Sequence, residues 1–154
     1  MKRFTHYFLL FLPAVAFVAC GPDPVYPLEP QLTFKEYRYN NNDSLKVMFT
    51  FTDGDGDIGV APTGSDPNLV LTLYYKGADG NFHVARPVTE PTDSISYPYR
   101  IAQLPRGQNG LSGEIHVDVD TEFMLYDTIQ FNAFLLDQTQ HKSAVIRTPE
   151  IVLQ

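Results

Sequence analysis

The stretch Phe49-Thr-Phe-Thr-Asp-Gly-Asp-Gly-Asp-Ile-Gly59 joins an alternating strand pattern to a run of closely spaced carboxylates. Just upstream, the same alternation begins at Leu45, so we expect a strand over residues 45–52 with one buried face. The apolar residues that share this face are Leu45, Val47, Phe49 and Phe51. The sequence therefore predicts a half-buried strand that leads directly into an acidic loop.

Working outward, the chain consists of short alternating segments separated by turn residues. We expect further strands at residues 31–39, 69–76, 82–85, 114–120, 129–136 and 144–153, and one or two strands around Pro98 within residues 95–104. The chain contains 12 prolines, and only residues 122–126 suggest a helical turn. Seven or eight short strands at this spacing predict an all-β fold, an immunoglobulin-like antiparallel β-sandwich.

Two of these segments indicate the core most clearly. Residues 114–120 place Ile115, Val117 and Val119 on one face, with charged residues on the other. Residues 129–136 place an apolar stripe inward, formed by Ile129, Phe131, Ala133 and Leu135. Phe134 and Leu136 lie on the opposite face and are also apolar. That face is covered either by the chain itself or by a partner.

The N-terminus has the pattern of a secretory signal. Met1-Lys2-Arg3 is followed by a mostly apolar run over residues 7–19, which is shorter than the roughly 20 residues of a membrane span. Phe17-Val18-Ala19-Cys20 resembles the lipobox of bacterial lipoproteins. The resemblance implies a signal peptide at 1–19 and acyl chains on Cys20 that anchor the protein in a membrane. The alternatives are a cleaved signal with a spare thiol, or an uncleaved anchor.

In the lipoprotein pattern, an aspartate after the cysteine signals retention in the inner membrane. Gly21 occupies that position, which favours the outer membrane, facing either the periplasm or the cell surface. Residues 20–30 contain alternate prolines and are predicted to be an extended tether, so the folded domain is expected at 31–154. Cys20 is the only cysteine, so no intramolecular disulfide can form.

Charge argues against some partners. Loss of Lys2 and Arg3 with the leader leaves nine basic against 18 acidic residues, a formal charge of −9. Such a surface repels nucleic acid and anionic lipid.

The acidic loop predicts a cation site. Asp53, Asp55 and Asp57 alternate with Gly54 and Gly56, which can take positive φ and curl the carboxylates toward one point. Calcium suits such a loop because it takes six to eight oxygens in an adaptable shell, whereas magnesium demands a tighter octahedron and zinc prefers His or Cys. The alternative is a solvated turn without an ion.

Further ligands must come from elsewhere, because the loop departs from an EF-hand: Ile58 stands where that motif has glycine, and Gly64 where it has glutamate. In an immunoglobulin-like fold, the loop after the second strand and the loop before the last lie at the same end. Asp137 is therefore the expected distant ligand. Asp66 or a backbone carbonyl near Ile58 could complete the shell.

The motif Phe-x-Phe-x-Asp-Gly-Asp-Gly-Asp-Ile-Gly, followed by an alternating strand that ends in Asp137, resembles a group of mostly uncharacterised Bacteroidota-type surface lipoproteins with an immunoglobulin or fibronectin type III-like domain. In that group the last two strands are often joined by an Asp-Arg-x-Gly-Asn turn, where this chain has Asp137-Gln-Thr-Gln-His141. The resemblance implies a cell-envelope binding or assembly module without a known activity.

No motif predicts an enzyme. Gly110-Leu-Ser-Gly-Glu114 lacks the final glycine of a nucleophile elbow. Asp118, Asp120 and Glu122 could imitate the carboxylate pair of a glycoside hydrolase, although a solvated polar face explains them better.

Binding is the favoured class, in two versions. The first is an accessory subunit that docks onto a larger envelope complex through Phe134, Leu136 or an uncovered sheet edge. The second is glycan binding through exposed tyrosines, namely Tyr74, Tyr97 and Tyr99. The chain has no Trp, the residue that often stacks on sugars, so a protein partner is favoured.

Overall fold

The computed structural model describes residues 25–41, 43–60, 64–105 and 110–154. The predicted signal peptide and Cys20 lie outside these ranges. Within these ranges the fold is all-β and contains no helix. The described residues therefore include no helix that is long and apolar enough to cross a membrane. The strands are β1 (Gln31–Asn41), β2 (Ser44–Asp53), β3 (Leu69–Lys76), β4 (Phe82–Val84), β5 (Ser96–Tyr99), β6 (Leu111–Asp120), β7 (Thr128–Leu135), β8 (Ile146–Arg147) and β9 (Ile151–Val152).

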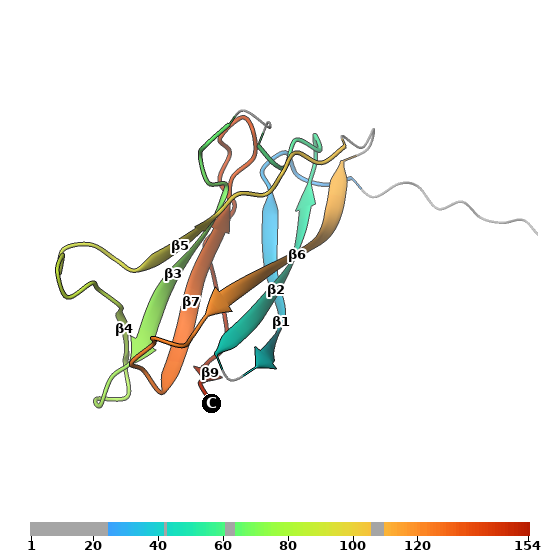
Figure 1. The fold of residues 1–154 in the computed structure, drawn as a ribbon. Helices are drawn as coiled ribbons and strands as arrows, with labels where there is room; N and C mark the ends of the chain where they lie inside the picture. The colour runs from blue at the N-terminus through green and yellow to red at the C-terminus, as the bar shows by residue number, and fades with distance from the viewer. Residues whose placement is uncertain (1–24, 42, 61–63, 106–109) are drawn as a thin grey trace, which may run out of the picture.

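The strands form two antiparallel sheets that pack as a sandwich (Figure 1). One sheet has the order β1-β2-β6. The other has the order β4-β3-β7-β8, with β5 also paired to β3 and β9 also paired to β7. The prediction of an immunoglobulin-like antiparallel sandwich is confirmed.

The core lies between the sheets and consists of the predicted inward stripes. Phe49 pairs with Ile115 across β2 and β6, and Phe131 pairs with Leu73 across β7 and β3. Every residue of the predicted stripes in β2, β6 and β7 is buried. These apolar side chains drive the two sheets together because burial removes their surfaces from water.

The described part of the chain has nine strands where the sequence predicts seven or eight, because the last predicted strand is broken in two. Between β8 and β9, Thr148 takes over the pairing with Phe131: its N–H donates to the Phe131 carbonyl at 2.9 Å, and its Oγ1 accepts from the Phe131 N–H at 3.0 Å. Pro149 follows and has no N–H to continue the ladder.

One edge of the second sheet is interrupted by a long loop. Strands β4 and β5 both pair with the same edge of β3, at Tyr74–Lys76 and at Leu69–Thr72 respectively. Residues 86–94 form the loop between them, which projects from the side of the sandwich in Figure 1.

Strands β2 and β7 end at the same pole of the sandwich. The loop after β2 meets the segment after β7 through an isolated antiparallel bridge between Ile58 and Asp137. The Gln138 N–H also donates to the Asp57 carbonyl at 3.2 Å. This junction brings together acidic residues that are far apart in the sequence.

Candidate metal site

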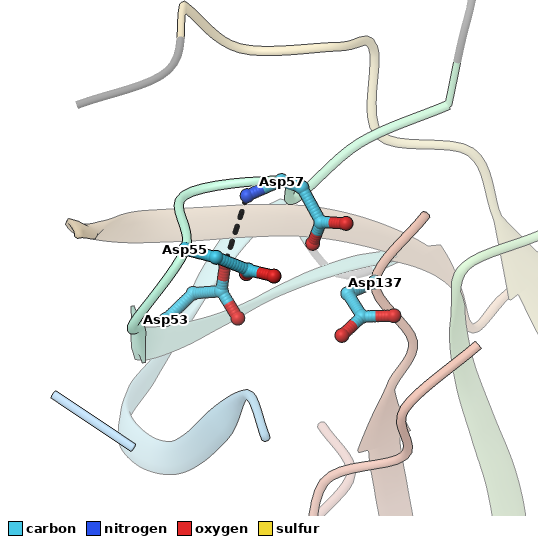
Figure 2. Close-up of side chains that lie close together, drawn as sticks. All are labelled: Asp53, Asp55, Asp57 and Asp137. Carbon is cyan, nitrogen blue, oxygen red and sulfur yellow. Dashed lines mark hydrogen bonds between the residues drawn. The ribbon is translucent and has the colours of Figure 1, made fainter. Parts of the chain in front are cut away.

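Four aspartates converge at the junction and are called here the aspartate cluster: Asp53, Asp55, Asp57 and Asp137. One carboxylate oxygen from each lies within 4.8 Å of those from the other three. Figure 2 shows Asp137, on the segment after β7, facing the three loop aspartates that follow β2. Asp53, Asp57 and Asp137 are buried, whereas Asp55 is exposed.

The loop folds by local backbone bonding. The Asp57 N–H donates to Asp53 Oδ2 at 2.9 Å, shown as the dashed line in Figure 2. Gly56 has φ of 67°, the left-handed conformation that the sequence predicts for it.

The same expectation is wrong for Gly54, which is not among the positive-φ glycines. Glycine is needed at position 54 because there is no room for a side chain: a Cβ there would lie 2.5 Å from the Pro27 carbonyl oxygen.

Asp137 is held by donors from its own turn. Its Oδ1 accepts from the His141 N–H at 2.7 Å and from Thr139 Oγ1 at 3.0 Å, and its Oδ2 lies 2.8 Å from His141 Nδ1. Gln140 has φ of 69°, which closes this turn without a glycine. The turn therefore orients the Asp137 carboxylate rigidly toward the loop.

The electrostatics of the cluster disfavour four bare carboxylates. Asp53 is fully buried, and its Oδ1 accepts no hydrogen bond from any residue that the structure describes. Burial, with the nearby carboxylates of Asp55 and Asp57, raises the pKa of Asp53 to about 6, although the hydrogen bond from the Asp57 N–H acts in the opposite direction. The hydrogen bond to Asp137 raises the pKa of His141, with smaller contributions from Glu29 and Asp55. Negative charge is therefore concentrated at the aspartate cluster.

Such an arrangement can hold a metal ion. Buried charges are stable only when they are paired or bound to a metal. A cation among these oxygens would give Asp53 Oδ1 the partner that it lacks. Two oxygens bound to one ion at calcium's distance of about 2.4 Å can be up to about 5 Å apart, so all four carboxylates can share one ion.

Asp66, another predicted ligand, is not part of the cluster. It is exposed, and its Oδ1 accepts from Ser65 Oγ at 3.5 Å. Two residues further on, the Asn68 carbonyl accepts from the Leu136 N–H and its Oδ1 accepts from the Ile101 N–H, which fixes the chain after Asp66. The Ile58 carbonyl accepts from the Leu104 N–H at 3.4 Å.

The predicted partner residues Phe134 and Leu136 are half-buried. Lys142 Nζ lies 3.7 Å from the centre of the Phe134 ring, and Leu136 forms a bridge with Lys142. The chain thus covers part of this face itself.

The three tyrosines predicted as a glycan platform are half-buried too. Tyr97 packs edge-on against Phe131, with ring centres 6.0 Å apart, and the Tyr99 hydroxyl donates to the Asp118 carbonyl at 2.9 Å. Tyr97 and Tyr99 both pack against the core, while Tyr74 lies under Arg147. This arrangement provides no open stacking platform.

The carboxylates considered for glycoside hydrolysis lie on the surface. Asp118 accepts from Asn40 Nδ2 at 2.9 Å and lies 3.4 Å from Lys46 Nζ. The Asn40 hydrogen bond, with Lys46, lowers the pKa of Asp118, the opposite of what a general acid needs. Asp120 accepts from the Glu122 N–H at 3.0 Å.

A feature that sequence reasoning missed lies between the 86–94 loop and residues 121–126. Arg86 Nη1 braces that loop by donating to the carbonyls of Pro91 and Thr92. A mainly apolar cavity of about 350 Å³ opens between the two segments. Three apolar side chains on its lining are exposed, Val88 by 97%, Phe123 by 80% and Leu125 by 92%. The only sequence signal was the isolated apolar residues within polar turns.

Searches against family models, curated proteins and solved structures found no match for this chain.

Proposed function

We propose that this protein is a lipid-anchored, calcium-stabilised binding or assembly module of a bacterial outer membrane. The observation that carries the calcium assignment is the buried Asp53 Oδ1, which lacks a hydrogen bond inside a group of four carboxylates. An all-oxygen, carboxylate-rich set on a loop suits calcium better than zinc, which prefers nitrogen and sulfur.

The role of the ion is structural. The cluster joins the loop after β2 to the turn after β7, so an ion there ties two distant parts of the chain together. Binding to the folded state alone stabilises it by about 2.7 kcal/mol at a hundredfold excess over Kd. Without disulfides, this contribution is large relative to the whole stability of a domain.

The envelope assignment rests on the sequence. Cys20 at the end of the apolar leader resembles a lipobox, and Gly21 favours the outer membrane. Incorporation of a labelled fatty acid in a Gram-negative host tests this, with Cys20→Ser as the variant expected to lose both label and membrane association. Equal labelling of the variant would contradict the anchor.

A protein partner remains the favoured ligand class. The exposed Val88, Phe123 and Leu125 surround an apolar cavity, and exposed apolar patches commonly mark interaction sites. The glycan alternative has less support because Tyr97 and Tyr99 pack against the core.

The calcium site is tested by thermal unfolding of the full chain in detergent, in excess EDTA and after addition of calcium or magnesium. We expect calcium to raise Tm by on the order of 10 °C. Asp55→Asn should remove most of this shift without disturbing the core, because Asp55 is exposed. The matched control is Asp66→Asn, which lies outside the cluster and should keep the full shift.

Absence of a calcium effect on the native chain would overturn the proposed site. An equal shift in the Asp55→Asn variant would place any bound ion elsewhere.

A further inference from the structure

The residues before β1 lie on the loop that carries the aspartate cluster. We call residues 26–30 the N-terminal arm. A Cβ at Gly54 would lie 2.5 Å from the Pro27 carbonyl oxygen and 2.6 Å from that of Tyr26. Since real Cβ atoms do not approach so closely, the arm and the acidic loop fit together only because residue 54 is glycine.

A second glycine completes this seat. Gly110 has φ of 93°, and a Cβ there would lie 2.7 Å from the Asp53 carbonyl oxygen and 2.9 Å from Tyr26 Cδ2. Tyr26 therefore packs close to the start of the loop, next to the first aspartate of the cluster. The tether that the sequence predicts for residues 20–30 is thus in contact with the domain from Tyr26 onward.

The other end of the arm is also attached. Pro30 is buried, and Gln31, the first residue of β1, donates from Nε2 to the Glu29 carbonyl at 3.0 Å. The arm is therefore held by the start of β1 at one end and packs against the acidic loop through Tyr26 and Pro27 at the other.

From this packing we infer that the N-terminal arm and the aspartate cluster form one cation-dependent unit, in which an ion bound by the aspartates fastens the arm to the domain. The inference rests on the cation site proposed above. Gly54 lies between Asp53 and Asp55 in the chain, so its position follows theirs. Mutual repulsion of the carboxylates opens the loop when no cation is present, and the seat for Tyr26 and Pro27 is lost with it.

This coupling would fix the orientation of the domain on a membrane. Tyr26 is the sixth residue after Cys20, so the chain between them spans at most about 20 Å when fully extended. With the arm fastened, the cation pole is held toward an anchor at Cys20.

A spin label at residue 25 reports on the arm directly. Val25 is 96% exposed, so Val25→Cys in a Cys20→Ser background places a nitroxide beside the arm without disturbing the core. The full chain in detergent is measured by electron paramagnetic resonance in EDTA and in calcium. Calcium should broaden the spectrum of this label. The matched control is Val88→Cys in the same background, which is 97% exposed on the 86–94 loop and should not respond.

Coupling between two sites is reciprocal, so the arm must also affect the ion. Tyr26→Ala removes the contact at Gly110 and should weaken calcium binding, measured by calorimetry, by at least about fivefold. Val25→Ala should leave it unchanged.

One outcome is that calcium binds and raises Tm without broadening the spectrum of the label, and that its affinity is the same in Tyr26→Ala as in the native chain. That result overturns the inference but leaves the calcium site standing. If no calcium binds to the native chain, both fall.

Discussion

Ile58 and Asp137 form an antiparallel β-bridge that joins the loop after β2 to the turn after β7. Ile58 is fully buried, and its neighbour in the sequence is the cluster residue Asp57. The candidate metal site is thus built directly onto the hydrophobic core, and its geometry depends on packing as well as on charge.

Ile58→Ala should therefore weaken both the core and the ion site. We expect a loss of about 2–5 kcal/mol in the free energy of unfolding, because the substitution leaves a cavity at a fully buried position. Urea denaturation in EDTA and in calcium measures both effects. Ile58→Val should cost only about 0.5–1.5 kcal/mol. Equal stability of the alanine variant and the native chain would show that the loop is not anchored by this residue.

Thr148 provides a second test, at the break between β8 and β9. Its hydroxyl accepts the buried Phe131 N–H, so Thr148→Val leaves that donor without a partner and should cost about 1–3 kcal/mol. Thr148→Ser keeps the acceptor and should retain most of the stability. Chemical denaturation compares the variants, and a valine variant as stable as the serine variant would argue against this bond.

The raised pKa of Tyr99 leads us to expect a lower free energy of unfolding at alkaline pH. Burial, with Tyr97 and Asp118 nearby, raises the pKa of Tyr99 to about 12, above the value near 10 expected in the unfolded chain. The folded state thus favours the neutral phenol. Its contribution is fully present below pH 10 and is lost as the pH rises from 10 to about 12.

Ultraviolet titration of tyrosinate should show one group ionising near pH 12 that is missing in Tyr99→Phe. That variant should also lose about 0.5–1.5 kcal/mol at neutral pH, because the hydroxyl bonds the Asp118 carbonyl. A native titration with every tyrosine near pH 10 would refute this assignment.

The exposed apolar side chains of Phe123 and Leu125 at the cavity should be dispensable for folding. Phe123→Ser with Leu125→Ser should change the free energy of unfolding by less than about 0.5 kcal/mol per site, because both side chains are exposed. Binding of a dye that reports exposed apolar surface should fall in this double variant and persist in Val145→Ser, which is 55% exposed away from the cavity lining. Strong destabilisation would instead place Phe123 or Leu125 in the core.

The strand faces could be predicted from the sequence because a period of two is a local property. Leu45 to Phe51 and Ile115 to Val119 alternate, and one face of each is buried as expected. The grouping of Asp137 with Asp53 followed from the fold class, since that fold places the two loops at one end. Asp66 lies outside the cluster although it is close in the sequence, and closeness along the chain could not reveal this because it does not fix the position of a side chain in space.

The amino-acid sequence by itself determined the fold class, the inward residues of the strands and the acidic character of the loop, because each depends on neighbouring residues along one segment. Tertiary structure alone decided the seat of Tyr26 and Pro27 on Gly54, the division of the last strand at Thr148, and the cavity beside Phe123. Each of these depends on contacts between segments distant in the chain, and such contacts leave no periodic signal in the residues that make them.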